Sequence, residues 1–250
     1  MSFPFDDGPP PGVSRREWRE RTNASPTAPT DSGAVPALAD ILGDTIPTAK
    51  KSTPPTILTV CTGNICRSPM AEVLLRARLE PLGVRVHSAG THALVDKPMT
   101  RESAKLAASF GVPAADSKAH RARWLTELHL TGPDLVLAMS REHRAHVVGL
   151  APARMRSTFT VREFERLAKN VGDAEIRDEA EAAGDDPHAR VRAALALLRA
   201  HRDRVEAPVD PADDDVVDPY RRSWDVYQQS ATELAPGLAE VARVLRIALT

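Results

Sequence analysis

The sequence predicts an α/β fold, a doubly wound parallel sheet of four strands with helices on both faces. Ile57–Val60 is apolar and β-branched, and Leu135–Met139 is continuously apolar without Gly or Pro. Such runs are typical of parallel strands buried on both faces. Stretches with helical spacing lie between them, and strands that alternate with helices favour right-handed crossovers within one sheet.

The elements that support this fold follow in order along the chain. The expected strands cover Ile57–Val60, Val84–His87, Leu135–Met139 and Arg154–Thr160. The expected helices cover Pro69–Leu79, Thr100–Phe110, His120–Leu130 and Arg141–Leu150. In the first helix, apolar residues recur at i, i+3, i+4 and i+7 from Met70. Pro69 is expected at the first helical position, where its missing N–H costs nothing.

The segment 169–215 is mostly charged and interrupts the regular pattern. Only 191–198 within it has helical spacing, so we expect a surface insertion, one helix on a flexible loop, with a lid over the site as the alternative. Two closing helices are expected over Trp224–Leu234 and Gly237–Leu249, with Pro236 starting or kinking the second. The expected domain is therefore 54–250, interrupted at 169–215.

Residues 1–53 form a segment of different composition, rich in Pro, Ser, Thr, Asp and Ala. They contain eight of the 21 prolines and no sustained apolar periodicity, which predicts a disordered tail. A match to PxxP at Pro26–Pro29 is too common in such sequence to identify a partner.

Composition and charge limit the classes of function. The formal net charge of -1 gives no steering toward nucleic acid or membranes, and we expect neither as a partner. The eight histidines show no metal-ligand spacing; His143 and His146 lie on an expected helix, where a solvated polar face is expected. No metal or cofactor is expected. Two cysteines suggest no disulfide framework and favour a reducing cytoplasm.

Both cysteines lie in one loop, between the first strand and the first helix. Cys61 opens this loop and Arg67 closes it, with Thr62, Gly63, Asn64, Ile65 and Cys66 between them. At such a position, backbone N–H groups can point at an anion, and the helix N-terminus and the Arg67 guanidinium favour the thiolate form of Cys61. A thiolate under a cradle of amides, closed by a guanidinium fork, fits a tetrahedral phosphate group.

The block Val60 to Glu72, VCTGNICRSPMAE, resembles the signature of the low-molecular-weight protein tyrosine phosphatases. Further marks are Ser88-Ala89-Gly90-Thr91 and Asp218-Pro219-Tyr220. The resemblance covers about 54–167 and 216–250. It implies a flavodoxin-like phosphotyrosine phosphatase I fold and hydrolysis of phosphotyrosine on proteins through a phosphocysteine, with Cys61 as nucleophile and Arg67 binding two phosphate oxygens.

The resemblance also assigns roles to neighbouring residues. Ser68 donates its hydroxyl to the thiolate, or serves as a plain helix N-cap. Asn64 holds the loop in its backbone shape, or reflects turn propensity alone. Cys66 forms a reversible disulfide with Cys61, or is a small core residue.

Asp218 is the expected general acid, and Tyr220 the expected wall of the substrate cleft. Val216 and Val217 separate Asp218 from the acidic run that includes Asp215, so we expect its carboxyl in a drier place. Arg221 and Arg222, which follow, favour acidic substrates.

Other functions remain open on the same scaffold. The segment 92–96 lacks the aromatic residue that members acting on phosphotyrosine often carry. Arsenate reduction would need an external thiol, because no cysteine follows Cys66. Protein arginine phosphatases typically have threonine where this chain has Ile65. A phosphate-binding pseudoenzyme that recruits a partner is the remaining alternative.

Overall fold

The computed structural model describes residues 53–250. The expected disordered tail, with its PxxP match, lies outside the described residues apart from Thr53.

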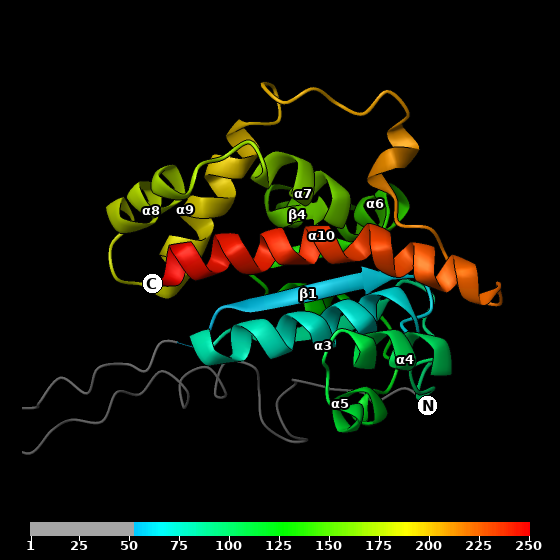
Figure 1. The fold of residues 1–250 in the computed structure, drawn as a ribbon. Helices are drawn as coiled ribbons and strands as arrows, with labels where there is room; N and C mark the ends of the chain where they lie inside the picture. Colours follow the sequence, from blue (N-terminus) through cyan, green and yellow to red (C-terminus); the bar gives the residue numbers. More distant parts are fainter. Residues whose placement is uncertain (1–52) are drawn as a thin grey trace, which may run out of the picture. The chain divides into compact units, whose positions relative to one another are not determined.

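The described strands form one parallel sheet (Figure 1). They are β1 (Thr56–Cys61), β2 (Arg85–Gly90), β3 (Leu135–Ala138) and β4 (Thr158–Thr160). Their order is β2-β1-β3-β4, and every neighbouring pair is parallel, which confirms the predicted four-stranded sheet. Cys61 pairs with Gly90 at the carboxyl edge of the sheet, where doubly wound folds bind their ligands.

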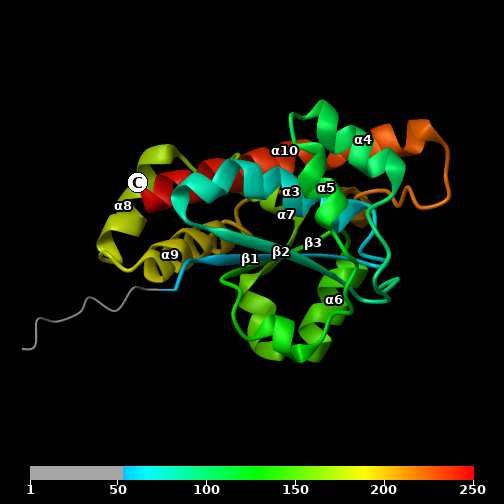
Figure 2. The same cartoon turned by 90° about the horizontal axis from the view of Figure 1, so that it is seen from below.

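Helices cover both faces of the sheet (Figure 2). Alternate β1 side chains point to opposite faces, so Ile57 and Cys61 join the larger core while Leu58 and Val60 join the smaller one. The larger core packs against α3 (Arg67–Leu79), and the smaller one includes Val147 of α6 (Arg141–Leu150). Both faces of β1 are therefore buried, which fixes the strand that leads into the loop from Cys61 to Arg67.

Helix α3 begins earlier than the sequence indicates. It starts at Arg67, so Pro69 is its third residue rather than its first. The proline is tolerated there because the first-turn N–H groups have no intrahelical acceptor. Its N-cap is Cys66, which makes no side-chain capping bond, so the N-cap interpretation of Ser68 is wrong.

Other helices do have side-chain caps at their N-termini. Thr100 caps α4 (Arg101–Ser109) by accepting a hydrogen bond from the Ser103 N–H. Thr160 and Glu163 form a capping box on α7 (Val161–Ala168), a helix that the sequence pattern did not separate from its surroundings.

One predicted helix is wrong, and one predicted strand is shorter than expected. The helix expected over 120–130 is absent: α5 (Ala114–Ala119) ends before this range, which holds an extended stretch and the 3₁₀ helix η2 (Glu127–Leu130). The stretch is extended because Trp124 pairs with Gly90 at the end of β2. The strand predicted over 154–160 shortens to β4, because Pro152–Ser157 forms the 3₁₀ helix η3.

The charged insertion is not a surface loop. Its middle forms α8 (Asp173–Ala182) and α9 (Pro187–Ala200), whose apolar residues join the larger core. These buried residues are Ile176, Ala180, Val191, Ala194, Leu195 and Leu198. The surface interpretation failed because charged residues outnumber the apolar ones in this segment, although these six apolar residues lie on the buried faces of α8 and α9. Beyond α9, η4 (Pro211–Asp214) is the last short element before the segment that carries Asp218.

A single long helix, α10 (Trp224–Leu249), closes the fold where two pieces were expected. Pro236 lies inside it and removes one backbone donor without ending the helix. Gly237 follows and lets the helix lie against Val161 of α7, where a Cβ would come 2.4 Å from Val161 Cγ1. No described helix is long and apolar enough to cross a membrane.

Candidate active site

Carbonyl groups of the loop between β1 and α3 are hydrogen-bonded to neighbouring segments of the chain. The carbonyls of Cys61, Thr62 and Gly63 accept hydrogen bonds of 2.9–3.0 Å from the backbone N–H groups of residues 91, 92 and 94. The Ile65 carbonyl accepts another from the Thr100 N–H at 2.9 Å. In the described part of the chain, the N–H groups of residues 62–66 have no acceptor. The loop therefore presents donors without acceptors, as a phosphate cradle requires.

Asn64 holds this shape from inside the fold. It is fully buried and has φ of 54°, the left-handed conformation that Asn tolerates. Its Oδ1 accepts from the Arg123 N–H at 2.9 Å, and its backbone carbonyl accepts from His120 Nε2 at 2.7 Å. The structural role expected for Asn64 thus has direct contacts, and turn propensity alone does not account for them.

A directed chain of hydrogen bonds runs from Glu72 to Cys61. Burial raises the pKa of Glu72, but hydrogen bonds from His120 and Ser88 outweigh it and keep that pKa below its usual value. The ionised carboxylate only accepts, so Ser88 Oγ donates to it at 2.5 Å. Asn64 Nδ2 then donates to Ser88 Oγ at 2.8 Å and to Ser68 Oγ at 2.9 Å. The Ser68 proton is left for Cys61 Sγ, 3.0 Å away.

The second cysteine, Cys66, contacts hydroxyl groups beside the loop. Its Sγ is 3.6 Å from Thr100 Oγ1 and 3.7 Å from the Tyr227 hydroxyl. Burial raises the pKa of the Cys66 thiol. Both cysteines are free thiols, so Cys66 here is a small buried residue, and its disulfide with Cys61 stays a prediction.

Arg67 reaches the rim of the loop from the first residue of α3. Its Nη1 donates to the Val216 carbonyl at 2.9 Å, and its Nη2 pairs with Asp218 Oδ2 at 2.8 Å. Its buried Nε has no partner among the described residues. The guanidinium is thus held by one backbone contact and paired with the predicted acid.

Asp218 lies at the predicted place but not in the predicted environment. Its side chain is 52% exposed, so the expectation of a drier setting is wrong. The Asp218 carboxylate pairs with Arg67 through Oδ2, and its Oδ1 accepts a hydrogen bond from the Tyr220 N–H at 3.2 Å. The Asp215 carboxylate instead accepts hydrogen bonds from Arg141, one from the backbone N–H and one from the guanidinium of that arginine.

These groups surround a pocket of about 130 Å³. Its lining residues are Cys61, Thr62, Gly63, Ile65, Cys66, Arg67, His92, Leu94, Asp218 and Tyr220. Tyr220 lines the pocket, and the Arg221 guanidinium lies 5.2 Å from its ring centroid; its contact with a substrate stays a prediction. The pocket combines a thiol at its floor with cationic, acidic and aromatic groups at its rim.

Sequence reasoning missed several supporting residues. His143 was expected on a solvated face, but it is buried, with Nε2 2.8 Å from Thr62 Oγ1 and Nδ1 2.7 Å from Ser140 Oγ. Burial and the Arg67 charge lower the pKa of His143 to about 4, so its ring is neutral. His120 and Arg123 were missed as well, since nothing local in the sequence links them to Asn64.

Comparisons with known proteins point to one family. The model of a family described as low molecular weight phosphotyrosine protein phosphatase matches residues 56–196, more than half of the chain. The low molecular weight protein-tyrosine-phosphatase Etp of Escherichia coli K12 is 50% identical over 96 residues. That alignment covers 38% of this chain and 62% of Etp, less than two thirds of the relative's length.

Two further relatives are arginine phosphatases by name. The protein-arginine-phosphatase of Bacillus subtilis is 29% identical over 192 residues, covering 76% of this chain and 96% of that protein. The solved structure of the YwlE arginine phosphatase from Geobacillus stearothermophilus is 27% identical, with a TM-score of 0.53. It covers 77% of this chain and 94% of its own.

Proposed function

Because the chain belongs to the low molecular weight phosphotyrosine protein phosphatase family, we propose that it hydrolyses phosphate monoesters, foremost phosphotyrosine on proteins. The observation that carries this proposal is the Cys61 thiol beside the Ser68 hydroxyl, 3.0 Å apart, under the rim formed by Arg67 and Asp218. We also propose a cytoplasmic location, because a sequence with two cysteines suggests no disulfide framework.

The proposed reaction has two displacements at phosphorus. The Cys61 thiolate attacks the phosphoryl group, the phosphorus–oxygen bond breaks, and Asp218 gives its proton to the leaving phenolic oxygen. Water then attacks the phosphocysteine while Asp218 takes a proton from it, and the phosphorus–sulfur bond breaks to release inorganic phosphate and the thiolate. The protein returns to its starting state without a redox change.

The loop contributes charge stabilisation to both steps. The free N–H groups of residues 62–66 and the planar fork of Arg67 can hold the three non-bridging oxygens as charge redistributes. The Ser68 hydroxyl, oriented by Asn64, supports the sulfur as attacking and as leaving group. Arg67 must exchange its Asp218 contact for the phosphate, and the released carboxylate must take up a proton from solvent before it can act as the acid.

The assignment of the acid has a direct test. Asp218→Asn is expected to slow an alkyl-substituted phenyl phosphate by about 10²–10⁴-fold, because a poor leaving group needs the proton. A nitro-substituted phenyl phosphate should lose far less, and the pH profile of kcat/KM should flatten. Asp215→Asn is the matched control, because that carboxylate contacts Arg141, and it should leave both substrates nearly unchanged.

Cys61→Ser is expected to abolish turnover of either phosphate. Full activity of Cys61→Ser would remove the phosphocysteine, and equal losses on both substrates for Asp218→Asn would move the acid elsewhere. A protein that binds phosphate tightly but turns over neither substrate would instead be a phosphate-binding pseudoenzyme.

Phosphoarginine on proteins is the second candidate substrate. It is favoured by the Bacillus subtilis arginine phosphatase, whose similarity to this chain covers nearly its whole length. Ile65 favours phosphotyrosine, because it adds apolar wall to the pocket where arginine phosphatases typically carry threonine. Paired kcat/KM values for a phosphotyrosine and a phosphoarginine peptide of the same sequence decide between them. A ratio that favours phosphoarginine would reverse the ranking.

A further inference from the structure

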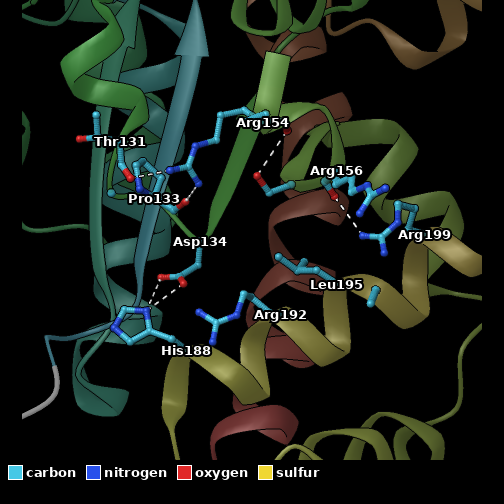
Figure 3. A pocket seen from close by; sticks show the side chains of 13 residues that line it. Thr131, Pro133, Asp134, Arg154, Arg156, His188, Arg192, Leu195 and Arg199 are labelled. Atoms are coloured by element: carbon cyan, nitrogen blue, oxygen red, sulfur yellow. Dashed lines mark hydrogen bonds and ion pairs between the residues drawn. The ribbon is translucent and has the colours of Figure 1, made fainter. Parts of the chain in front are cut away.

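A second pocket lies at the amino edge of the sheet, opposite the edge that carries Cys61. Figure 3 shows this pocket from close by, with the side chains that line it. It has a volume of about 580 Å³, and its walls come from the segment before β3, from η3 and from α9. The first two of these segments precede β3 and β4, whereas Cys61 ends the parallel strand β1. A strand of six residues spans about 20 Å, so the two pockets are separate sites.

The pocket is strongly basic. Its lining residues are Thr131, Gly132, Pro133, Asp134, Ala153, Arg154, Arg156, Ser157, His188, Arg192, Leu195, Ala196 and Arg199. Asp134 is the single carboxylate among these lining residues, and it is already engaged: His188 Nδ1 lies 2.8 Å from its Oδ1, and the Thr56 N–H donates to it at 2.9 Å. The hydrogen bond with Asp134 raises the pKa of His188 and adds positive character to this edge.

Three of the four guanidinium groups have capacity for a ligand. Arg154 is committed, since it donates to the carbonyls of Thr131 and Pro133. Arg199 uses one N–H for the Arg156 carbonyl at 3.3 Å. Within the described part of the chain, Arg192 pairs with Asp186 alone, at 3.5 Å, and both side chains are exposed. The Arg156 guanidinium makes no hydrogen bond or ion pair with residues 53–250.

Such a cluster is electrostatically unfavourable when empty and favourable around an anion. Figure 3 shows Arg156 and Arg199 together at one end of the pocket and Leu195 beside its centre. Guanidinium forks pair bidentately with phosphate oxygens, so three of them suit a ligand with several phosphate groups.

The size of the pocket points to an organic ligand. Its volume falls within the range of about 300–1,000 Å³ that is usual for small-molecule sites and is far larger than one phosphate needs. Ala196 provides apolar surface next to the arginines, and the largely buried Leu195 and Pro133 also line this wall. We propose that this pocket binds an organic polyphosphate of the nucleoside-polyphosphate class. Arg156, Arg192 and Arg199 hold its phosphates, and Ala196 contacts its apolar body.

The test measures ATP binding to the full chain by titration calorimetry at fixed ionic strength. The pocket variant Arg156→Ser/Arg192→Ser/Arg199→Ser is expected to bind ATP at least tenfold more weakly than the unmodified chain. The control variant Arg78→Ser/Arg177→Ser/Arg246→Ser removes the same charge from exposed positions outside the pocket and should stay within about twofold. Equal weakening in both variants would mean general charge attraction and overturn the proposal.

Two more titrations locate the bound ATP and test its organic part. ATP affinity should survive Arg67→Met, because that change removes a phosphate ligand only from the catalytic loop; its loss there would place ATP at the active site and overturn the proposal. Inorganic tripolyphosphate should bind more weakly than ATP. Equal affinities would show that the nucleoside part of ATP adds nothing to binding, and would refute the proposal that the ligand is organic.

A single substitution tests the site even if the triple variant misfolds. Arg156 is exposed and its side chain makes no hydrogen bond or ion pair in 53–250, so Arg156→Glu should leave the fold intact. It should also weaken ATP binding, because it places a negative charge beside the phosphates. Unchanged affinity would count against the site, as would a lack of ATP binding by the unmodified chain.

Discussion

Gly90→Ala tests whether the catalytic loop depends on close backbone contact with β2. Gly90 ends β2 opposite Cys61. A Cβ at this position would lie 2.4 Å from the Thr62 carbonyl oxygen and 3.0 Å from both Asn64 N and Asn64 Cβ. Each of these atoms belongs to the phosphate-binding loop, and the Thr62 carbonyl is also held by the His92 N–H at 3.0 Å.

The size of the effect follows from these distances. An ordinary contact begins at 3.4 Å, so the Thr62 carbonyl has to retreat by about 1 Å. Overpacking of this kind typically costs about 1–3 kcal/mol of folding stability. A displacement of about 1 Å in a catalytic group can cost about 10²-fold in rate, so the loss of activity should exceed what the loss of stability explains.

The assay compares kcat/KM for an aryl phosphate with the melting temperature of the same variant. Gly237→Ala is a matched control, because its Cβ would also meet a neighbour at 2.4 Å, but on Val161 between α10 and α7. It should lower the melting temperature to a similar extent and keep kcat/KM within about threefold. Normal activity for Gly90→Ala, or an equal loss for both variants, would refute the reasoning.

Three other predictions concern stability. The pKa of His143 is lowered from 6.5 to about 4, so this residue takes up a proton when the chain unfolds at acid pH. The free energy of unfolding should therefore fall by up to roughly 3 kcal/mol as the pH drops from 6.5 through 4. Urea unfolding of His143→Gln should show a smaller fall, and an identical pH dependence would exclude His143 as its source. Leu198→Ala should lower the free energy of unfolding by about 2–5 kcal/mol in urea, because Leu198 is fully buried. Val209→Ala is the control and should change it hardly at all, because Val209 is fully exposed. An unchanged stability of Leu198→Ala would mean that α9 contributes little to the core. Removal of residues 1–50, which lack apolar periodicity, should change neither kcat/KM nor the melting temperature, and a large fall in the latter would show that they pack on the domain.

The parts of the site that are local in sequence were predictable. Cys61 and Arg67 share one strand-loop-helix unit, and the periodicity on either side of the loop fixes its setting. Asp218 was found through its Pro and Tyr neighbours, although it lies far along the chain. Its exposure was not predictable, because the ion pair with Arg67 depends on how two distant segments meet.

The supporting network was beyond sequence reasoning for the same reason. His120, Arg123 and His143 contact the loop from segments more than fifty residues away, and a lone polar residue has no periodicity to reveal such a contact. The stretch 120–126 was mistaken for a helix because its pairing with Gly90 overrides local preference. Helix α8 was missed because only Ile176 and Ala180 of its residues are buried.

In this structure a carboxylate already competes with any incoming anion for Arg67. With Arg67 bound to Asp218, every incoming dianion must first displace a carboxylate that is tethered beside it and never diffuses away. Since Asp218 is half exposed, this pairing is worth about 1 kcal/mol, or roughly a fivefold loss of apparent affinity. Asp218→Ala should therefore bind inorganic phosphate about fivefold more tightly than the unmodified chain in calorimetry, and unchanged affinity would mean that the pair costs the site nothing. Anions that pair only weakly with Arg67 would then fail to displace Asp218, the residue proposed as the acid.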